Sequence, residues 1–268
     1  MLQWFHNYIP QPILFQWNWL SVHWYGLIIA AAIIIGYIIT ARFASKNNFS
    51  RKLWGDMLFY AVISGLIGAR LYHVILELPY YFRNPIEIFQ VWHGGLAIHG
   101  AIIGGALAVY YFSRRHNWQY TKVLDILVIA LILGQAFGRW GNYFNQELFG
   151  LPTDLSWGIF IEIANRPMEY LQYNYFHPTF LYEFIANILL LIGLIIVYKY
   201  KNKVAGLTAS IYLIVYSIIR FCLEFLRIDR TPELAGLRWP QWASIIILLL
   251  VAIYWFKLRD LQKSNKPV

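Results

Sequence analysis

Five polar side chains lie close together in one short segment, GRWGNYFNQELFG, which spans residues 138–150 and ends a long apolar run. They are Arg139, Asn142, Asn145, Gln146 and Glu147. Polar groups at the edge of a hydrocarbon layer are costly unless they bind one another or a ligand. We therefore expect this segment to form part of a binding site.

A second set of polar residues recurs at helical spacing further along the chain. One continuous helix would present them as a single stripe at i, i+4, i+8 and i+11: Tyr216, Arg220, Glu224 and Arg227. Two arginines face one glutamate there, so with Arg139 and Arg70 we expect a net-positive cavity for an anion. Arginine suits a phosphate, because its planar fork binds two oxygens and stays charged in an apolar setting. Mutual neutralisation of Arg220 and Glu224 as an internal staple is the alternative.

His99 is a candidate general base, because a histidine pKa lies near neutrality. It stands in the sequence HGGLAIHGAIIGG, where Gly100 and Gly104 form a GxxxG face that lets another helix approach closely. A histidine that only packs and makes one hydrogen bond is the alternative. No GxSxG, HExxH, Walker or paired CxxC motif is present, and Cys222 lies in an apolar run. A nucleophile would therefore have to come from the substrate.

The composition indicates which elements must position these residues. Hydrophobic residues make up 59% of the 268 residues, charged residues only 13%, and the mean hydropathy is +0.50. A soluble protein has roughly a quarter of its residues charged, and a helix needs roughly 20 apolar residues to cross a bilayer. We therefore expect an all-α integral membrane protein, one polytopic domain over residues 1–268. The seven predicted transmembrane helices are residues 19–40, 55–76, 95–112, 123–140, 178–198, 205–226 and 240–257.

The charged residues between these spans predict the orientation of the chain. Most lysines and arginines lie in three short connectors and the C-terminal tail: Arg42, Lys46, Arg51, Lys52, Arg114, Arg115, Lys122, Lys199, Lys201, Lys203, Lys257, Arg259, Lys263 and Lys266. Because basic loops stay cytoplasmic, we expect the N-terminus outside and the C-terminus in the cytoplasm. This asymmetry accounts for most of the +9 net charge, so nucleic acid is not expected as a partner.

The same topology places the polar residues of the spans near the outer leaflet. Arg70, His99, Arg139 and Arg220 all fall toward the outer ends of their predicted helices. A channel or pump would need polar groups along its whole path, so these spans favour a site that opens to one leaflet. The long outer connector, residues 141–177, contains the strand-prone sequence WGIFIEI, and we expect a small extracytoplasmic head there, between the fourth and fifth helices.

Residues 138–150 resemble the signature G-R-x-G-N-[FY]-x-N-x-E-x-x-G of the bacterial prolipoprotein diacylglyceryl transferases at every fixed position. The similarity continues in GLAIHG around His99, GARL at 68–71, HPTFLYE at 177–183 and YSIIRFCLEFLR at 216–227. It implies transfer of the diacylglyceryl group from phosphatidylglycerol to the lipobox cysteine in a prolipoprotein signal peptide, with release of glycerol phosphate. It also implies a multi-pass protein among the lipids of the bacterial cytoplasmic (inner) membrane, with its active site facing the outer leaflet.

The resemblance also implies roles for individual residues. His99, Arg139 and Arg220 are the expected catalytic residues: Arg139 would hold the phosphodiester, Arg220 would stabilise the departing phosphate, and His99 is the family's proposed base, with an arginine-assisted route as the alternative. The expected substrate-binding residues are Tyr25, Asn142, Asn145, Glu147, Gly150, Tyr216, Glu224 and Arg227. The expected supporting residues are Arg70, His177, Tyr182 and Glu183. No metal or cofactor is expected, because the leaving group is already a phosphate ester. Phe180 departs from the pattern, since many members have glutamine there.

Two other classes of function fit part of the pattern. An anionic-lipid transporter or flippase would bind the same headgroup, but it would need polar residues that continue to the cytoplasmic side. The inner halves of the predicted spans look apolar apart from Asp125. A non-enzymatic assembly factor would not require so many converging arginines. We therefore expect the transferase.

Overall fold

The computed structural model describes residue 6, residues 8–18, residues 20–201 and residues 204–264. The predicted inner residues Lys203 and Lys266 lie outside this part of the chain. The fold divides into two compact units, a larger one of residues 1–36 and 127–268 and a smaller one of residues 37–126. The boundaries between them fall inside two helices, α2 (Trp24–Lys46) and α6 (Tyr120–Phe144).

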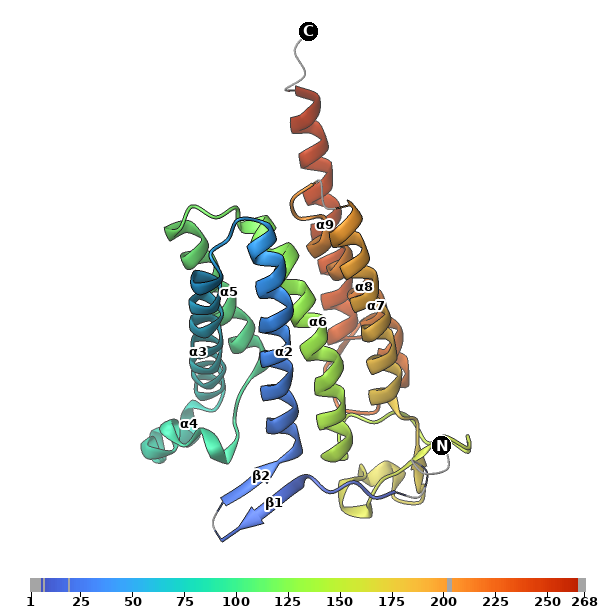
Figure 1. The fold of residues 1–268 in the computed structure, drawn as a ribbon. Coiled ribbons are helices and arrows are strands. Elements are labelled where there is room, and N and C mark those ends of the chain that lie inside the picture. The colour runs from blue at the N-terminus through green and yellow to red at the C-terminus, as the bar shows by residue number, and fades with distance from the viewer. Residues whose placement is uncertain (1–5, 7, 19, 202–203, 265–268) are drawn as a thin grey trace. The chain divides into compact units, whose positions relative to one another are not determined.

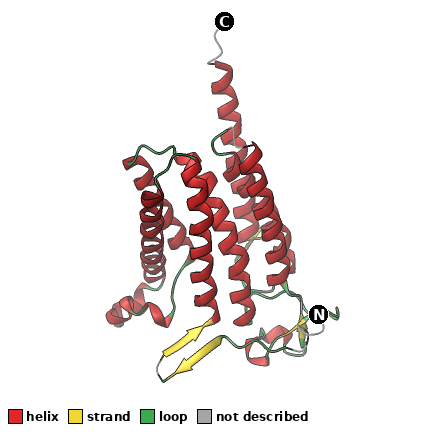
Figure 2. Cartoon of the chain, in the orientation of Figure 1, coloured by secondary structure: helices red, strands yellow, loops and turns green. Residues whose placement is uncertain are grey.

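Long helices account for most of the described residues (Figure 1; Figure 2). Besides α2 and α6 they are α3 (Arg51–Leu76), α5 (Ile98–Arg115), α7 (Thr179–Lys201), α8 (Leu207–Leu223) and α9 (Trp239–Ser264). Apolar sequence favours helices in a membrane, because a helix satisfies its own backbone hydrogen bonds within the hydrocarbon. Six helices of the described chain are long and apolar enough to cross a membrane. Arg114 and Arg115 end α5, which does not belong to these six.

The first predicted span, residues 19–40, is wrong at its start. An antiparallel hairpin precedes the helix, with β1 (Ile13–Trp17) paired to β2 (Leu20–His23). Polar residues interrupt the apolar run here, and Asn18 has a positive φ of 51°, which asparagine tolerates better than most residues. The helix therefore begins at Trp24 and continues to Lys46.

The sixth predicted span, residues 205–226, ends at the same residue as the described span Leu207–Leu226, but its last turn is not α-helical. The α-helix α8 stops at Leu223, and the 3₁₀ turn η5 (Glu224–Leu226) follows before the extended backbone of Arg227. The predicted single stripe is consequently broken between Glu224 and Arg227. A helix ends where its last carbonyls find other partners, and here the side chain of Arg238 binds two of them.

In the smaller unit, α3 and α5 pack closely. Three short helices connect them, α4 (Leu78–Arg83), η1 (Pro85–Phe89) and η2 (Val91–His93). Backbone carbonyls of α3 occupy the positions that side chains on two glycines of α5 would take. The carbonyl oxygen of Gly68 would meet a Cβ at Gly100, and that of Ser64 would meet a Cβ at Gly104. The close approach predicted from the GxxxG face is confirmed.

In the larger unit, the connector between α6 and α7 folds into a small head. Because α6 continues to Phe144, the head begins at Asn145 and not at residue 141. It contains β3 (Ile159–Phe160) paired with β4 (Tyr175–Phe176), which confirms the strand expected in WGIFIEI, and the 3₁₀ turns η3 (Ile163–Asn165) and η4 (Met168–Tyr170). Figure 1 shows the head beside the last turn of α6 and the first turn of α7.

The core of the head explains the departure at Phe180. The buried residues of this core are Tyr143, Phe149, Ile159, Ile161, Phe176 and Phe180. Phe180 stacks on Tyr143 with ring centroids 4.5 Å apart, and its ring also meets the edge of Trp140. A second hairpin, β5 (Glu233–Leu234) with β6 (Leu237–Arg238), lies between η5 and α9.

Candidate active site

Residues 138–150 form the last turn of α6 and the reversal that follows it. The amide of Gln146 donates to the carbonyl of Tyr143, and the amide of Glu147 donates to the carbonyl of Asn142, both at 3.0 Å. Gln146 itself is left-handed, with a φ of 50°. These features make a Schellman motif, which ends a helix and satisfies its last carbonyls. The reversal brings the Glu147 carboxylate back to the side chain of Asn142.

Arg139 is held in a fixed orientation by partners on α6 and α7. Its Nη1 donates to Oδ1 of Asn142 (3.0 Å), and its Nε lies 3.1 Å from Oε1 of Glu183. Asn142 is buried, and its Nδ2 donates to Oε1 of Glu147 (2.8 Å). Asn145 donates to the same carboxylate oxygen at 3.3 Å. Four residues predicted from the signature therefore do form one network, and Glu183 completes it.

Tyr216 on α8 connects Arg139 with Arg220. Its hydroxyl donates to Oε1 of Glu183 (3.4 Å), the oxygen that also faces Nε of Arg139. The same hydroxyl lies within electrostatic range of the Arg139 and Arg220 guanidinium groups. Within the larger unit, α6, α7 and α8 therefore bring two predicted catalytic arginines to a common centre.

Arg220 forms the ion pair with Glu224 that was the alternative interpretation of the sequence, but one of its nitrogens has no partner in the described part of the chain. Its Nη2 lies 2.7 Å from Oε2 of Glu224, whose side chain is fully buried. Its Nη1 is also buried but has no hydrogen-bond partner among the described residues. A buried donor without a partner costs about 1–3 kcal/mol. An anionic oxygen placed beside Arg220 would supply the missing interaction.

The predicted excess of positive charge is not present in this cluster. The ionisable groups are Arg139, Arg220, Arg227 and Arg238 against Glu147, Glu183, Glu224 and Asp229. Helical spacing on α8 could not reveal this balance, because Glu183 comes from α7 and Asp229 from the loop after η5. The carboxylates therefore orient the arginines. For the binding of an anion, the unpartnered Nη1 of Arg220 is more important than the net charge of the cluster.

Arg227 turns away from the stripe toward Asp229. Its Nε lies 2.7 Å from Oδ1 of Asp229. Burial alone would raise the pKa of the Asp229 carboxyl, but the hydrogen bond and charge of Arg227, together with the charge of Arg238, lower it below its ordinary value. Asp229 is therefore ionised at neutral pH and serves as the counter-ion of Arg227.

Tyr25 and Gly150 both have packing partners at this end of the larger unit. The ring of Tyr25 fills the space that a side chain at Gly141 would need. A side chain at Gly150 would stand 2.8 Å from atoms of His177, Thr179 and Leu226, so only glycine fits. Gly150 lets the chain leaving α6 pair with η5 and with the start of α7.

His177 and Tyr182 join the head to α7. The Tyr182 hydroxyl accepts from Nε1 of Trp157 (2.9 Å) and lies 3.1 Å from Nδ1 of His177. Burial lowers the pKa of His177, so its imidazole is neutral at neutral pH. The contacts of these two predicted supporting residues are with the head.

Arg70 and His99 belong to the smaller unit. Arg70 is buried, and its guanidinium donates to four backbone carbonyls between residues 87 and 95. It therefore fixes the segment that leads into α5. His99 is the second residue of α5, where its ring is exposed and lies 5.8 Å from that of Tyr72.

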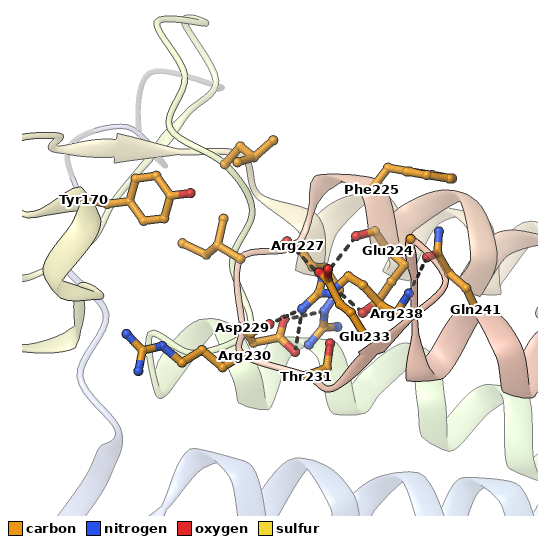
Figure 3. A pocket seen from close by; sticks show the side chains of 13 residues that line it. Tyr170, Glu224, Phe225, Arg227, Asp229, Arg230, Thr231, Glu233, Arg238 and Gln241 are labelled. Carbon is orange, nitrogen blue, oxygen red and sulfur yellow. Dashed lines mark hydrogen bonds and ion pairs between the residues drawn. The ribbon is translucent and has the colours of Figure 1, made fainter.

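Sequence reasoning missed three residues of the larger unit: Asp229, Trp157 and Arg238. Arg238 could have been found, because it is a cation two residues before the predicted span 240–257. It lines a cavity of about 460 Å³ together with Glu224, Arg227 and Asp229 (Figure 3).

The chain is similar to known proteins over most of its length. The prolipoprotein diacylglyceryl transferase family matches residues 12–257. A phosphatidylglycerol–prolipoprotein diacylglyceryl transferase of Parasynechococcus marenigrum is 42% identical, covering 94% of this chain and 96% of that protein. Proteins of the same name from Synechocystis sp. and Synechococcus elongatus are each 43% identical, covering 95% and 96% of this chain and 92% of their own length. The chain therefore belongs to the prolipoprotein diacylglyceryl transferase family.

Proposed function

We propose that this protein transfers the diacylglyceryl group of phosphatidylglycerol to the thiol of the lipobox cysteine in prolipoproteins, the first step of lipoprotein maturation. Membership of the family and the names of its relatives support this activity. The observation that carries the proposal is the arginine pair. Arg139 and Arg220 are each oriented by a carboxylate, and Arg220 keeps a buried nitrogen for an anionic oxygen.

The reaction needs one bond to form and one to break. The cysteine thiol loses its proton, and its sulfur attacks the glyceryl carbon that carries the phosphate. A carbon–sulfur bond forms while the carbon–oxygen bond to the phosphate breaks, so glycerol phosphate leaves with the electron pair and the thioether stays in the membrane. Negative charge therefore moves onto the phosphate oxygen in the transition state. Donors fixed in advance at that oxygen lower the barrier.

The residues of the larger unit fit this demand. We assign the phosphodiester to Arg139 and the developing charge on the leaving phosphate to Arg220. Asn142, Asn145 and Glu147 would order the glycerol headgroup, because their amides and carboxylate can bind its hydroxyls. Tyr216, Glu224 and Arg227 would complete the wall of the site, and Gly150 shapes its edge. Tyr25 would orient the lipid.

We assign removal of the thiol proton to His99, as the family resemblance implies. Arg70 supports this role within the smaller unit, because its hydrogen bonds fix the segment from which α5 begins. His177 and Tyr182 would support the site indirectly by anchoring the head, and Glu183 would do so directly by orienting Arg139.

We propose that α5 crosses the membrane together with the six more apolar helices, which gives seven spans. The basic connectors would place the C-terminus in the cytoplasm and the N-terminus and the head outside. The arginines, which lie at the head end of α6 and α8, would then face the outer leaflet of the bacterial inner membrane. That is the side from which an exported signal peptide presents its cysteine.

The test is incubation of the purified protein with phosphatidylglycerol and a lipobox peptide. We expect the peptide to gain the mass of one diacylglyceryl unit, and we expect no gain on a control peptide whose cysteine is replaced by serine. Absence of the gain would overturn the proposed function. A lipid transporter is not favoured, since the matched family and the relatives are transferases.

A further inference from the structure

Among the described arginine side chains of the larger unit, Arg238 has the most partners, although it lies outside every family motif quoted above. Its Nη1 lies 3.0 Å from Oε1 of Glu224 and donates to the carbonyls of Glu224 (3.1 Å) and Arg227 (3.0 Å). Its Nη2 donates to the carbonyl of Asp229, and the Asp229 carboxylate lies 3.9 Å away. Figure 3 shows the Arg238 side chain among these partners.

These contacts divide the Glu224 carboxylate between two arginines. Arg220 pairs with Oε2 at 2.7 Å and Arg238 pairs with Oε1 at 3.0 Å, both as ion pairs without hydrogen-bond geometry. Glu224 is fully buried, so no solvent competes for either oxygen. With Oε1 occupied, Glu224 meets Arg220 through one oxygen only, and Nη1 of Arg220 remains without a partner.

Loss of Arg238 would change this division. A buried carboxylate without its second partner favours a bidentate fork with the arginine that remains, because two parallel bonds satisfy both oxygens. Glu224 would then take Nη1 of Arg220 as well as Nη2. We propose that Arg238 is a positioning residue that keeps Nη1 of Arg220 available for the phosphate of the lipid donor. This inference rests on the proposed function.

The backbone contacts of Arg238 serve the same end. They bind the carbonyl of Arg227 and that of Glu224, which also accepts from the amide of Arg227, and they hold a cation at the C-terminal end of α8 and η5. The turn from Glu224 to Asp229 is thereby fixed by a side chain of the hairpin that follows it. This places the Glu224 carboxylate where both arginines can reach it.

The test compares Arg238→Gln with the wild type in the full-length protein, using phosphatidylglycerol and a lipobox peptide. We expect the KM for phosphatidylglycerol to rise at least tenfold and the KM for the peptide to stay within twofold. A general distortion would raise both. Arg230→Gln is the matched control, because Arg230 lines the same cavity but is exposed, and its one ion pair among the described residues is with the exposed Glu169. It should leave both constants within twofold.

A second arm tests whether Arg238 acts through Glu224, and it measures phosphatidylglycerol binding so that an inactive background still gives a value. In a Glu224→Gln background, Arg238→Gln should change the dissociation constant less than twofold, since the competing carboxylate is gone. An equal loss in both backgrounds, or an unchanged KM for the lipid in the single variant, would overturn the inference. If Arg238→Gln does not accumulate, Arg238→Lys can be used in the same two experiments, with a smaller expected rise in the KM and the dissociation constant for phosphatidylglycerol. A wild type without transfer activity would instead reject the proposed function.

Discussion

At the scale of single residues, the arginines of α6 and α8 act as oriented donors. Arg139 meets Asn142 and Glu183, and Arg220 meets Glu224, so their planes are set before any substrate arrives. A donor that already has the correct orientation needs no reorganisation during the reaction. This is the physical reason why carboxylates hold the arginines in a neutral cluster.

Replacing Arg139 by alanine should lower the rate of transfer by about 10²–10³, the usual effect of losing one fixed donor to a developing anion. The protein should still insert and should elute as a single species, because the lost contacts lie at one end of the helices. Arg139→Lys should recover only part of the rate, since an ammonium group lacks the planar fork. Normal turnover in Arg139→Ala would reject the assignment of this residue to the phosphate.

Replacing His99 by glutamine tests the proposed base. The rate at neutral pH should fall by about 10²–10⁴ if a general base is lost, while phosphatidylglycerol binding changes much less. The pH dependence of the remaining rate should also flatten, because the titrating group is gone. A pH–rate profile identical in shape to that of the wild type would point to the arginine-assisted route.

At the scale of elements, helix ends and helix contacts set the geometry of the site. The Schellman motif at the end of α6 returns Glu147 to Asn142, and the early end of α8 releases Arg227 to Asp229. In the smaller unit, the approach of α3 to α5 depends on glycine.

Gly100→Ala should destabilise the α3–α5 pair, because the new methyl group would meet the carbonyl of Gly68 and the side chain of Tyr72. The backbone cannot yield cheaply there, so we expect a clear loss of thermal stability. Gly193→Ala on α7 is the control, since the space beside Gly193 is open. Equal melting temperatures for the two variants would contradict this account of the helix contact.

The anchoring of the head should depend on pH through His177. Burial lowers the pKa of this histidine, so the unfolded chain takes up its proton at a higher pH than the folded head. The neutral imidazole of His177 contributes its full stabilisation of the head above about pH 6.5. This stabilisation is lost as the pH falls through the pKa that His177 has in the folded head. Asp229, whose pKa is also lowered, acts only in a lower window, below about pH 4.

Limited proteolysis of the head between pH 7 and pH 5 measures this effect. Cleavage in the wild type should accelerate toward acid, and His177→Asn should weaken that trend. His23→Asn, which replaces an exposed histidine, should keep the wild-type trend. A trend unchanged by His177→Asn would show that another group controls the head.

At the scale of the whole molecule, the sequence predicts the long helices and several of the polar contacts within the larger unit. Apolar runs locate helices because length and hydropathy are local properties. The network from Arg139 to Glu147 lies within nine residues, and Arg220 with Glu224 lies one turn apart, so spacing alone could pair them. Polar groups in such runs are rare enough to stand out.

The remaining features depend on contacts between distant residues. Glu183 on α7 neutralises Arg139 on α6, and Asp229 reaches Arg227 only because the helix ends before it, so the cluster of the larger unit lacks the expected positive excess. Arg238 reaches back fourteen residues to Glu224, and no periodicity reveals that contact. The second strand of the hairpin, Leu20–His23, was taken for the start of a helix, because short apolar runs suit either structure.

The central claim is transfer by cleavage of the carbon–oxygen bond next to the phosphate. The direct measurement uses phosphatidylglycerol with ¹⁸O at the oxygen that bridges the diacylglyceryl carbon and the phosphorus, together with a lipobox peptide. We predict that the peptide gains one unlabelled diacylglyceryl unit and that the released glycerol phosphate carries the ¹⁸O. Recovery of the label in diacylglycerol or on the peptide would contradict the account, because the phosphorus–oxygen bond would then have broken instead.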